Sequence, residues 1–204
     1  MDIKLILFAI IFSFCKTSFS QKAHDISYKQ FGFIAGTDIS NMNFNAGFPT
    51  PAAPVEASWK SGINLGLLVH IPLGKNFSLQ PEYHYVQRRG SDKSIGSAYR
   101  ANYLSLPVLL IYSISPCFAL LAGPQQELLI TAKAINNEGS SNITHDMEER
   151  SFGVTGGFNL RIYRSFFLSA RYLHGLNHIG IGQRSDIKEF KYQSASLSLE
   201  FDFK

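Results

Sequence analysis

The stretch YQSASLSLEFDF, residues 192–203, alternates apolar and polar side chains along almost its whole length. In a β-strand, successive side chains point to opposite faces, so a repeat of two separates an apolar face from a polar one. The stretch is about as long as the 9–11 residues that a tilted membrane-spanning strand needs. The apolar row consists of Ala195, Leu197, Leu199, Phe201 and Phe203, and the polar row of Ser194, Ser196, Ser198, Glu200 and Asp202.

The same alternation recurs upstream and predicts eight strands in all. Leu68 is an exception to the pattern of its own segment, because it is apolar on the polar face. Two segments, 102–112 and 118–130, are apolar on both faces, which leaves their orientation open. The upstream segments are 31–39, 62–71, 77–86, 102–112, 118–130, 152–162 and one that contains Leu168 to Tyr172.

The connections between these segments alternate between long and short. Four long connections on one rim and three tight turns on the other are typical of a barrel in an outer membrane. We therefore predict an all-β fold, an eight-stranded antiparallel up-and-down transmembrane β-barrel with four long outer loops and three short periplasmic turns. In chain order, the connections span residues 40–60, 73–76, 88–101, 113–117, 131–151, 163–165 and 175–191.

The N-terminus has the organisation of an export signal. Lys4 precedes an apolar run from Leu5 to Phe14, and Ser18-Phe19-Ser20 places small residues where a signal peptidase cleaves. The run is too short for a membrane-spanning helix. The sequence therefore predicts a cleaved signal peptide over 1–20, a single barrel domain over 21–204 and a location in the cell outer membrane.

Composition excludes several classes of function. Without residues 1–20, which carry Lys4, Lys16 and Asp2, 17 basic and 14 acidic residues remain, too even a balance to indicate nucleic acid. Cys117 is then the single cysteine, so no internal disulfide is expected. Since no zinc-binding spacing occurs either, we expect no metal site and no cofactor.

Alternation alone does not decide which face meets lipid, because a soluble lipocalin-type barrel has its apolar face inside. The export signal, Phe203 near the C-terminus and the small residues of the polar row favour the membrane version, in which outer-membrane lipid surrounds a narrow polar lumen. Aromatic residues near strand ends could then form two girdles at the headgroups. These residues are Phe31, Phe33, Phe77, Tyr83, Tyr85, Tyr103, Tyr112, Phe118, Phe166, Phe167, Tyr172 and Tyr192.

Charged residues on the inward row need partners, because unpaired ions in a confined lumen are costly. We predict a hydrogen-bonded luminal ion network with a structural role. A polar conduit or proton path is the functional alternative. The members of the predicted network are Glu82, His84, Arg161, Arg171 and Glu200.

Three stretches resemble the PorT-like outer-membrane β-barrel proteins: LGLLVHIPLGKNFSLQPEYHYVQRRG (65–90), ANYLSLPVLLIY (101–112) and FGVTGGFNLRIYRSFFLSARYLHGLNHIG (152–180). The resemblance covers nearly all of residues 25–204. The family usually has an acidic residue at the position of Ser105. The resemblance implies a Gram-negative outer-membrane location, and for some relatives a place in a secretion or gliding apparatus.

No catalytic constellation stands out, and we predict no enzyme. His84 beside Glu82 is the one pair to consider for catalysis, and His145, Asp146, Glu148 and Glu149 could gather a cation in a loop. The predicted function is that of a non-enzymatic, monomeric surface barrel, either binding or structural, or an accessory component of an envelope secretion system with envelope proteins as partners. The alternatives are an outer-leaflet lipid-modifying enzyme and a small-solute channel.

Overall fold

The structure is a computed structural model that describes residues 30–46, 57–92, 97–136, 139–181 and 188–203. The predicted signal peptide lies outside these residues. Eight long strands dominate the described part of the chain: β1 (Gln30–Asn43), β2 (Lys60–Pro72), β3 (Phe77–Asp92), β4 (Ser97–Ser115), β5 (Phe118–Asn136), β7 (Arg150–Tyr163), β8 (Phe166–Gly175) and β10 (Lys188–Asp202). Short elements lie between them: η1 (Phe44–Ala46), β6 (Gly139–Asn142), η2 (Thr144–Asp146) and β9 (Ile179–Ile181).

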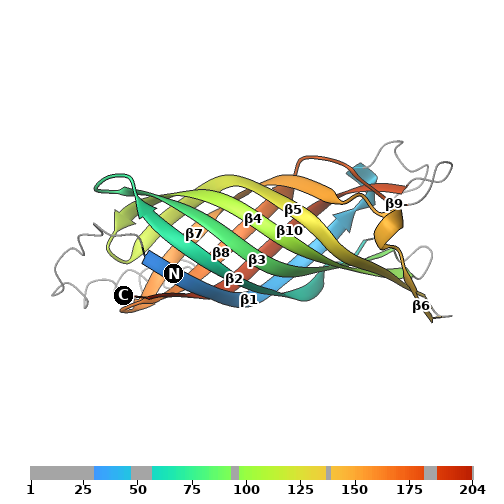
Figure 1. The fold of residues 1–204 in the computed structure, drawn as a ribbon, viewed down its shortest axis with the longest axis horizontal. Helices are drawn as coiled ribbons and strands as arrows, with labels where there is room; N and C mark the ends of the chain where they lie inside the picture. Colours follow the sequence, from blue (N-terminus) through green and yellow to red (C-terminus); the bar gives the residue numbers. More distant parts are fainter. Residues whose placement is uncertain (1–29, 47–56, 93–96, 137–138, 182–187, 204) are drawn as a thin grey trace, which may run out of the picture.

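The eight long strands form a closed antiparallel barrel. Each strand pairs with the next in the chain, and β10 pairs with β1 from Gly32↔Asp202 to Asn43↔Lys191. Closure leaves none of these strands with an unpaired edge, which a sheet in a hydrocarbon environment requires. The predicted fold class is confirmed (Figure 1). Among the described residues, no helix is both long enough and apolar enough to cross a membrane.

The two ends of the barrel differ, as the connection lengths predict. The tight turns at 73–76, 116–117 and 164–165 lie at one end, which we call the short-turn end, and β6 and β9 lie at the other, the loop end (Figure 1). The second outer connection is shorter than the predicted loop over 88–101. There, β3 continues to Asp92 and β4 already begins at Ser97, so a β-hairpin projects where a loop was expected.

The outer wall of the barrel is apolar, and a group of its aromatic rings lies at the short-turn end. Leu197 and Leu199 are each 53% exposed, while Ser198 between them is buried in the lumen. Rings pair across neighbouring strands, with centroids 4.9 Å apart for Phe77 and Tyr112 and 4.8 Å apart for Phe166 and Phe201. Such a belt is the surface that a barrel presents to lipid.

Three of the twelve predicted girdle residues belong to the interior instead. Tyr103 (0% exposed) and Tyr192 (1% exposed) point into the barrel and meet edge to face, 5.7 Å apart. Phe167 lies at an inward position of β8, and its ring is 5.1 Å from the guanidinium carbon of Arg161. The girdle interpretation of these three residues is wrong, because the inside of the barrel is not uniformly polar.

Apolar residues fill the interior near both ends. At the short-turn end, Leu109, Ile111 and Leu121 form a buried cluster, which explains why 102–112 and 118–130 are apolar on both faces. At the loop end, a larger cluster, the loop-end cap, closes the barrel and includes residues from η1, β9 and the segment after η2. The buried residues of the cap are Met42, Phe44, Ala101, Tyr103, Ala132, Met147, Ile179, Phe190 and Tyr192.

Candidate functional site in the barrel lumen

Between the two apolar clusters the lumen holds charged side chains, which form two networks. The one nearer the tight turns, the short-turn network, is organised around the fully buried carboxylate of Glu82. Arg171 Nη1 donates a hydrogen bond to Glu82 Oε2 over 2.6 Å, and His84 Nε2 lies 2.8 Å from the same oxygen. Gln80 Nε2 donates to Glu82 Oε1 over 2.6 Å. Both oxygens of this carboxylate are therefore occupied.

The same network extends to a second buried carboxylate, that of Glu200 on β10. Arg171 Nη2 lies 3.6 Å from Glu200 Oε2, and Asn159 Nδ2 donates to that oxygen over 3.2 Å. On the other side, His70 Nε2 lies 3.0 Å from Glu200 Oε1 and 3.4 Å from Asp202 Oδ1. Arg171 thus bridges glutamates on two non-adjacent strands, which ties β3, β8 and β10 together.

The structure brings together four of the five residues of the predicted ion network. Glu82, His84, Arg171 and Glu200 are in contact, whereas Arg161 lies apart at the short-turn end against Phe167. The alternation of side chains along the strand places Arg161 inward, but it does not give the height of Arg161 in the barrel. The prediction did not include His70 on β2 or Asp202 on β10, and these two residues complete the network.

The second network, the loop-end network, surrounds Arg88, which is 2% exposed. Its guanidinium donates to Asp38 Oδ1 over 2.8 Å and, through two nitrogens, to Glu127 over 2.5 and 3.2 Å. Gln125 Nε2 donates to Glu127 Oε1 over 2.8 Å. The ring of Tyr192 stacks above the guanidinium, with its centroid 5.7 Å from Arg88 Cζ.

Sequence reasoning missed this second network for identifiable reasons. Arg88 fell in a stretch assigned to a loop, and Glu127 fell in a strand whose orientation was open. A usable signal existed on β3, because continuing the inward row from Glu82 and His84 by two steps of two residues reaches Arg88. No comparable pattern identifies its partners, since their approach depends on the register of the closed barrel.

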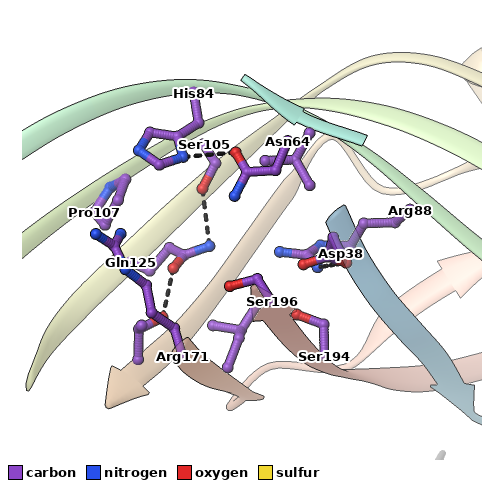
Figure 2. A pocket seen from close by; sticks show the side chains of 13 residues that line it. Asp38, Asn64, His84, Arg88, Ser105, Pro107, Gln125, Arg171, Ser194 and Ser196 are labelled. Atoms are coloured by element: carbon purple, nitrogen blue, oxygen red, sulfur yellow. Dashed lines mark hydrogen bonds and ion pairs between the residues drawn. The ribbon is translucent and has the colours of Figure 1, made fainter. Parts of the chain in front are cut away.

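A small cavity of about 30 Å³ lies between the two networks. Figure 2 shows Asp38 and Arg88 on one side of it, and Asn64, His84 and Arg171 on the other. A space of this size holds one or two water molecules at most. Together, the two networks and the two apolar clusters therefore occupy much of the described lumen.

Small residues in the wall make room for this packing. At Gly66, a Cβ atom would lie 2.6 Å from the His84 ring and 2.8 Å from the carbonyl oxygen of Tyr83. His84 pairs across strands with Gly66, so the glycine provides the space that the imidazole occupies. Glycine in the polar row of the sequence is thus a packing requirement of an eight-strand lumen.

One group of described side chains has the composition of a metal site. The ligand atoms of His70, Glu200 and Asp202 all lie within 4.8 Å of one another. These are also the residues that end the short-turn network, where His70 already contacts both carboxylates. The group His145, Asp146, Glu148 and Glu149, considered from the sequence, forms no such cluster in the described structure.

The geometry around His84 gives it structural contacts. Its Nδ1 pairs with Asn64 Oδ1 at 2.8 Å, while Nε2 faces Glu82. Ser105 lies across the strand pair from His84, but its hydroxyl accepts a hydrogen bond from Gln125 over 2.8 Å and the residue is buried. In this Glu–His–Ser arrangement, both ring nitrogens of His84 already face a partner and all three residues are buried.

Comparison with known proteins agrees with this architecture. Residues 19–180 match the family described as outer membrane protein beta-barrel domain. The chain belongs to this family. An outer-membrane location follows from that membership. In barrels of this kind the short turns face the periplasm and the long loops face the outside of the cell. A search of curated proteins found no match.

Solved structures of small outer-membrane barrels share the fold. Ail, the attachment invasion locus protein of Yersinia pestis, is 14% identical with a TM-score of 0.51, covering 85% of this chain and 98% of Ail. Neisserial surface protein A is 12% identical with a TM-score of 0.52, covering 85% and 97%. Ail in complex with the heparin analogue sucrose octasulfate is 14% identical with a TM-score of 0.50, covering 86% and 99%.

Proposed function

We propose that this outer-membrane barrel is a non-enzymatic anchor that holds a stiff, surface-exposed head for contact with a partner. The observation that carries the proposal is the filled lumen. Two ion networks and two apolar clusters occupy it, and the described part leaves a cavity of about 30 Å³. An interior of this kind supports a scaffold role and disfavours a small-solute channel.

The shape of the loop end supports a binding role. β4 and β5 each have 19 residues, and at about 3.3 Å per residue and a tilt of about 40° such a strand rises roughly 45 Å. The apolar band of an outer-membrane barrel is about 25 Å tall. The hairpins therefore project well beyond the membrane, and a rigid scaffold that carries loops is a common arrangement for binding.

The loop-end cap supports the same proposal. Phe44 of η1 packs against Phe190 of β10 with ring centroids 5.4 Å apart, and Met147 and Ile179 are buried in the same cluster. The connections that leave the barrel are thus fixed to its mouth over part of their length. A pre-ordered surface loses less conformational entropy on binding than free loops do.

Two resemblances suggest the kind of partner. Ail, a barrel of the same fold, has been solved with a heparin analogue, which makes a sulfated or otherwise acidic surface molecule one candidate for the loops. The PorT-like stretches suggest an accessory component of an envelope secretion system as the second. A lipid-modifying enzyme is disfavoured, because Glu82, His84 and Ser105 are buried in the lumen, away from acyl chains.

The proposal is tested by crosslinking in intact cells. A photoreactive amino acid at Ser141, exposed on β6 at the loop end, is compared with one at Lys75, exposed in a tight turn at the other rim. We expect a reproducible protein or polysaccharide adduct from Ser141. An adduct from Lys75 alone would contradict surface binding and favour a periplasmic partner.

Two further measurements address the alternatives. Ion conductance in planar bilayers should stay at the baseline level, and steady single-channel steps would contradict the closed lumen. Lipid A from cells with and without the gene should have the same mass spectrum. A mass difference restored by the gene would establish the enzyme in place of the anchor.

A further inference from the structure

Three basic side chains lie next to one another on the outer wall of the barrel. Arg89 on β3 pairs across strands with Arg100 on β4, and Arg100 pairs with Lys133 on β5. We call these three residues the basic row. Their inward-facing neighbours Arg88, Ala101 and Ala132 are buried in the lumen, so the basic row is on the opposite, outward face.

This arrangement is unfavourable unless a negative charge accompanies it. Like charges directly opposite each other on neighbouring strands destabilise a sheet. Among the side chains that the structure describes, no carboxylate forms an ion pair with Arg89, Arg100 or Lys133. In addition, Arg100 Nε is buried and has no hydrogen-bond partner there. The row therefore has the charge and the donor groups of an anion-binding site.

The height of the row follows from the strand register. Arg89 and Arg100 lie twelve residues from the paired aromatic residues Phe77 and Tyr112 at the short-turn end. Twelve residues at about 3.3 Å each, tilted by about 40°, rise roughly 30 Å. Since the apolar band is about 25 Å tall, the row lies about 5 Å above it, within the outer headgroup layer.

The residues just below the row mark the same boundary. Gln87 Nε2 donates to Asn102 Oδ1 over 3.2 Å, and Asn102 Nδ2 donates to Thr131 Oγ1 over 2.8 Å, which forms a polar ladder across β3, β4 and β5. Arg89 Nε and Nη2 donate to Gln87 Oε1 over 2.9 and 2.5 Å. The Arg89 guanidinium is thus held close to this ladder, on the side that faces the membrane.

We propose that the basic row binds the phosphate groups of a phosphorylated glycolipid in the outer leaflet. Two guanidinium groups offer paired N–H donors that match phosphate oxygens, and Lys133 adds a third positive charge. A soluble anion would meet the same charges, but the position beside the apolar wall favours a ligand whose acyl chains lie against β3 to β5. The inference uses the outer-membrane location and is independent of the proposed partner of the loops.

The first test counts bound lipid by native mass spectrometry of the refolded full-length barrel. The probes are diphosphorylated lipid A and the same lipid with its phosphates removed. Replacing all three residues (R89Q/R100Q/K133Q) should weaken binding of the phosphorylated probe about tenfold or more, since each charge-assisted contact contributes modestly and three are lost. The dephosphorylated probe should bind the unmodified and variant barrels equally weakly.

A matched variant, K75Q/R150Q/K191Q, removes the same net charge without touching the row. Arg150 pairs with Leu128 and Lys191 with Asn43, so neither has a basic cross-strand neighbour, and Lys75 lies in a tight turn. This variant should retain most of the binding. Equal loss in both triple variants, or equal affinity for both probes, would overturn the proposal. Competition by inorganic phosphate as effective as that by lipid A would overturn the assignment to lipid.

A stability measurement separates ligand binding from a structural role. In zwitterionic detergent, Arg100→Gln should leave the unfolding temperature unchanged or raise it, because it relieves repulsion along the row. In bilayers that contain lipid A, the same change should lower it, and Arg100→Lys should restore most of the difference. A decrease of equal size in both environments would show that Arg100 acts through packing and would contradict the proposal.

Discussion

Removing the charge of Arg88 is the sharpest test of the luminal networks. Arg88→Met keeps a long apolar side chain but leaves the carboxylates of Asp38 and Glu127, 3% and 1% exposed, without their cation. Breaking a buried ion pair in this way costs about 3–5 kcal/mol. With a urea dependence of about 2 kcal/mol per molar, the unfolding midpoint should fall by roughly 1.5–2.5 M.

The measurement is equilibrium urea unfolding of the barrel in lipid vesicles. Fluorescence of Trp59, the single tryptophan of the chain, reports the transition at the loop end. The exposed residue Arg150 provides the control, and Arg150→Met should change stability by no more than about 0.5 kcal/mol.

A compensating variant makes the reasoning refutable. In R88M/D38N/E127Q no unpaired charge remains, and most of the lost stability should return, because the large penalty belongs to the uncompensated carboxylates. If Arg88→Met alone costs less than about 1 kcal/mol, or if the triple variant is no more stable than the single one, the loop-end network does not stabilise the barrel as argued.

Two further predictions concern the inner and outer faces of the wall. Gly66→Ala places a methyl group 2.6 Å from the His84 ring and should lower the free energy of unfolding by about 1–3 kcal/mol in the same assay. Gly74→Ala, whose added methyl group has nothing within 4 Å, should leave stability unchanged. Equal effects of the two changes would contradict tight packing in the lumen. Leu199→Arg places a charge on the lipid-facing wall and should lower the free energy of unfolding by about 2–4 kcal/mol. Leu73→Arg, in an exposed turn, should lower it far less. Equal losses would contradict lipid contact at Leu199.

The sequence was sufficient to predict the barrel because lipid imposes one simple pattern. Within the membrane the outer wall must be apolar, so Leu197 and Leu199 alternate with serines. This two-residue repeat is enough to identify the strands in the sequence. The alternation of tight and long connections supplied the topology. All eight strands were found in this way, and the structure lengthens most of them.

The pattern failed where the membrane ends, because the polarity of the wall reverses there. Above the apolar band, Arg89 and Arg100 face outward while Ala101, Tyr103 and Tyr192 pack inside the loop-end cap. A rule that expects apolar side chains on the outside therefore predicts a loop where the hairpin projects. The same rule places Tyr103 and Tyr192 in an aromatic girdle.

The candidate site was predicted only in part, for a different reason. The two-residue alternation of side chains shows which charged residues face inward. It identified Glu82, His84, Arg171 and Glu200. Which of them meet depends on strand tilt and register around the closed wall, which no local pattern encodes. Arg161 also faces inward, but it lies closer to the tight turns than the short-turn network does. His70, by contrast, lies at the height of Glu200.

Contact between the apolar wall and acyl chains is the central claim, and spin labels on β10 test it most directly. In a Cys117→Ser background, cysteines at residues 196, 197, 198 and 199 carry the label in turn, and collision rates with oxygen and with a water-soluble nickel chelate are measured in bilayers. Labels at Leu197 and Leu199 should collide often with oxygen and rarely with the chelate, and labels at Ser196 and Ser198 rarely with either. Frequent chelate collisions at Leu197 and Leu199 would place that wall in water and contradict the account.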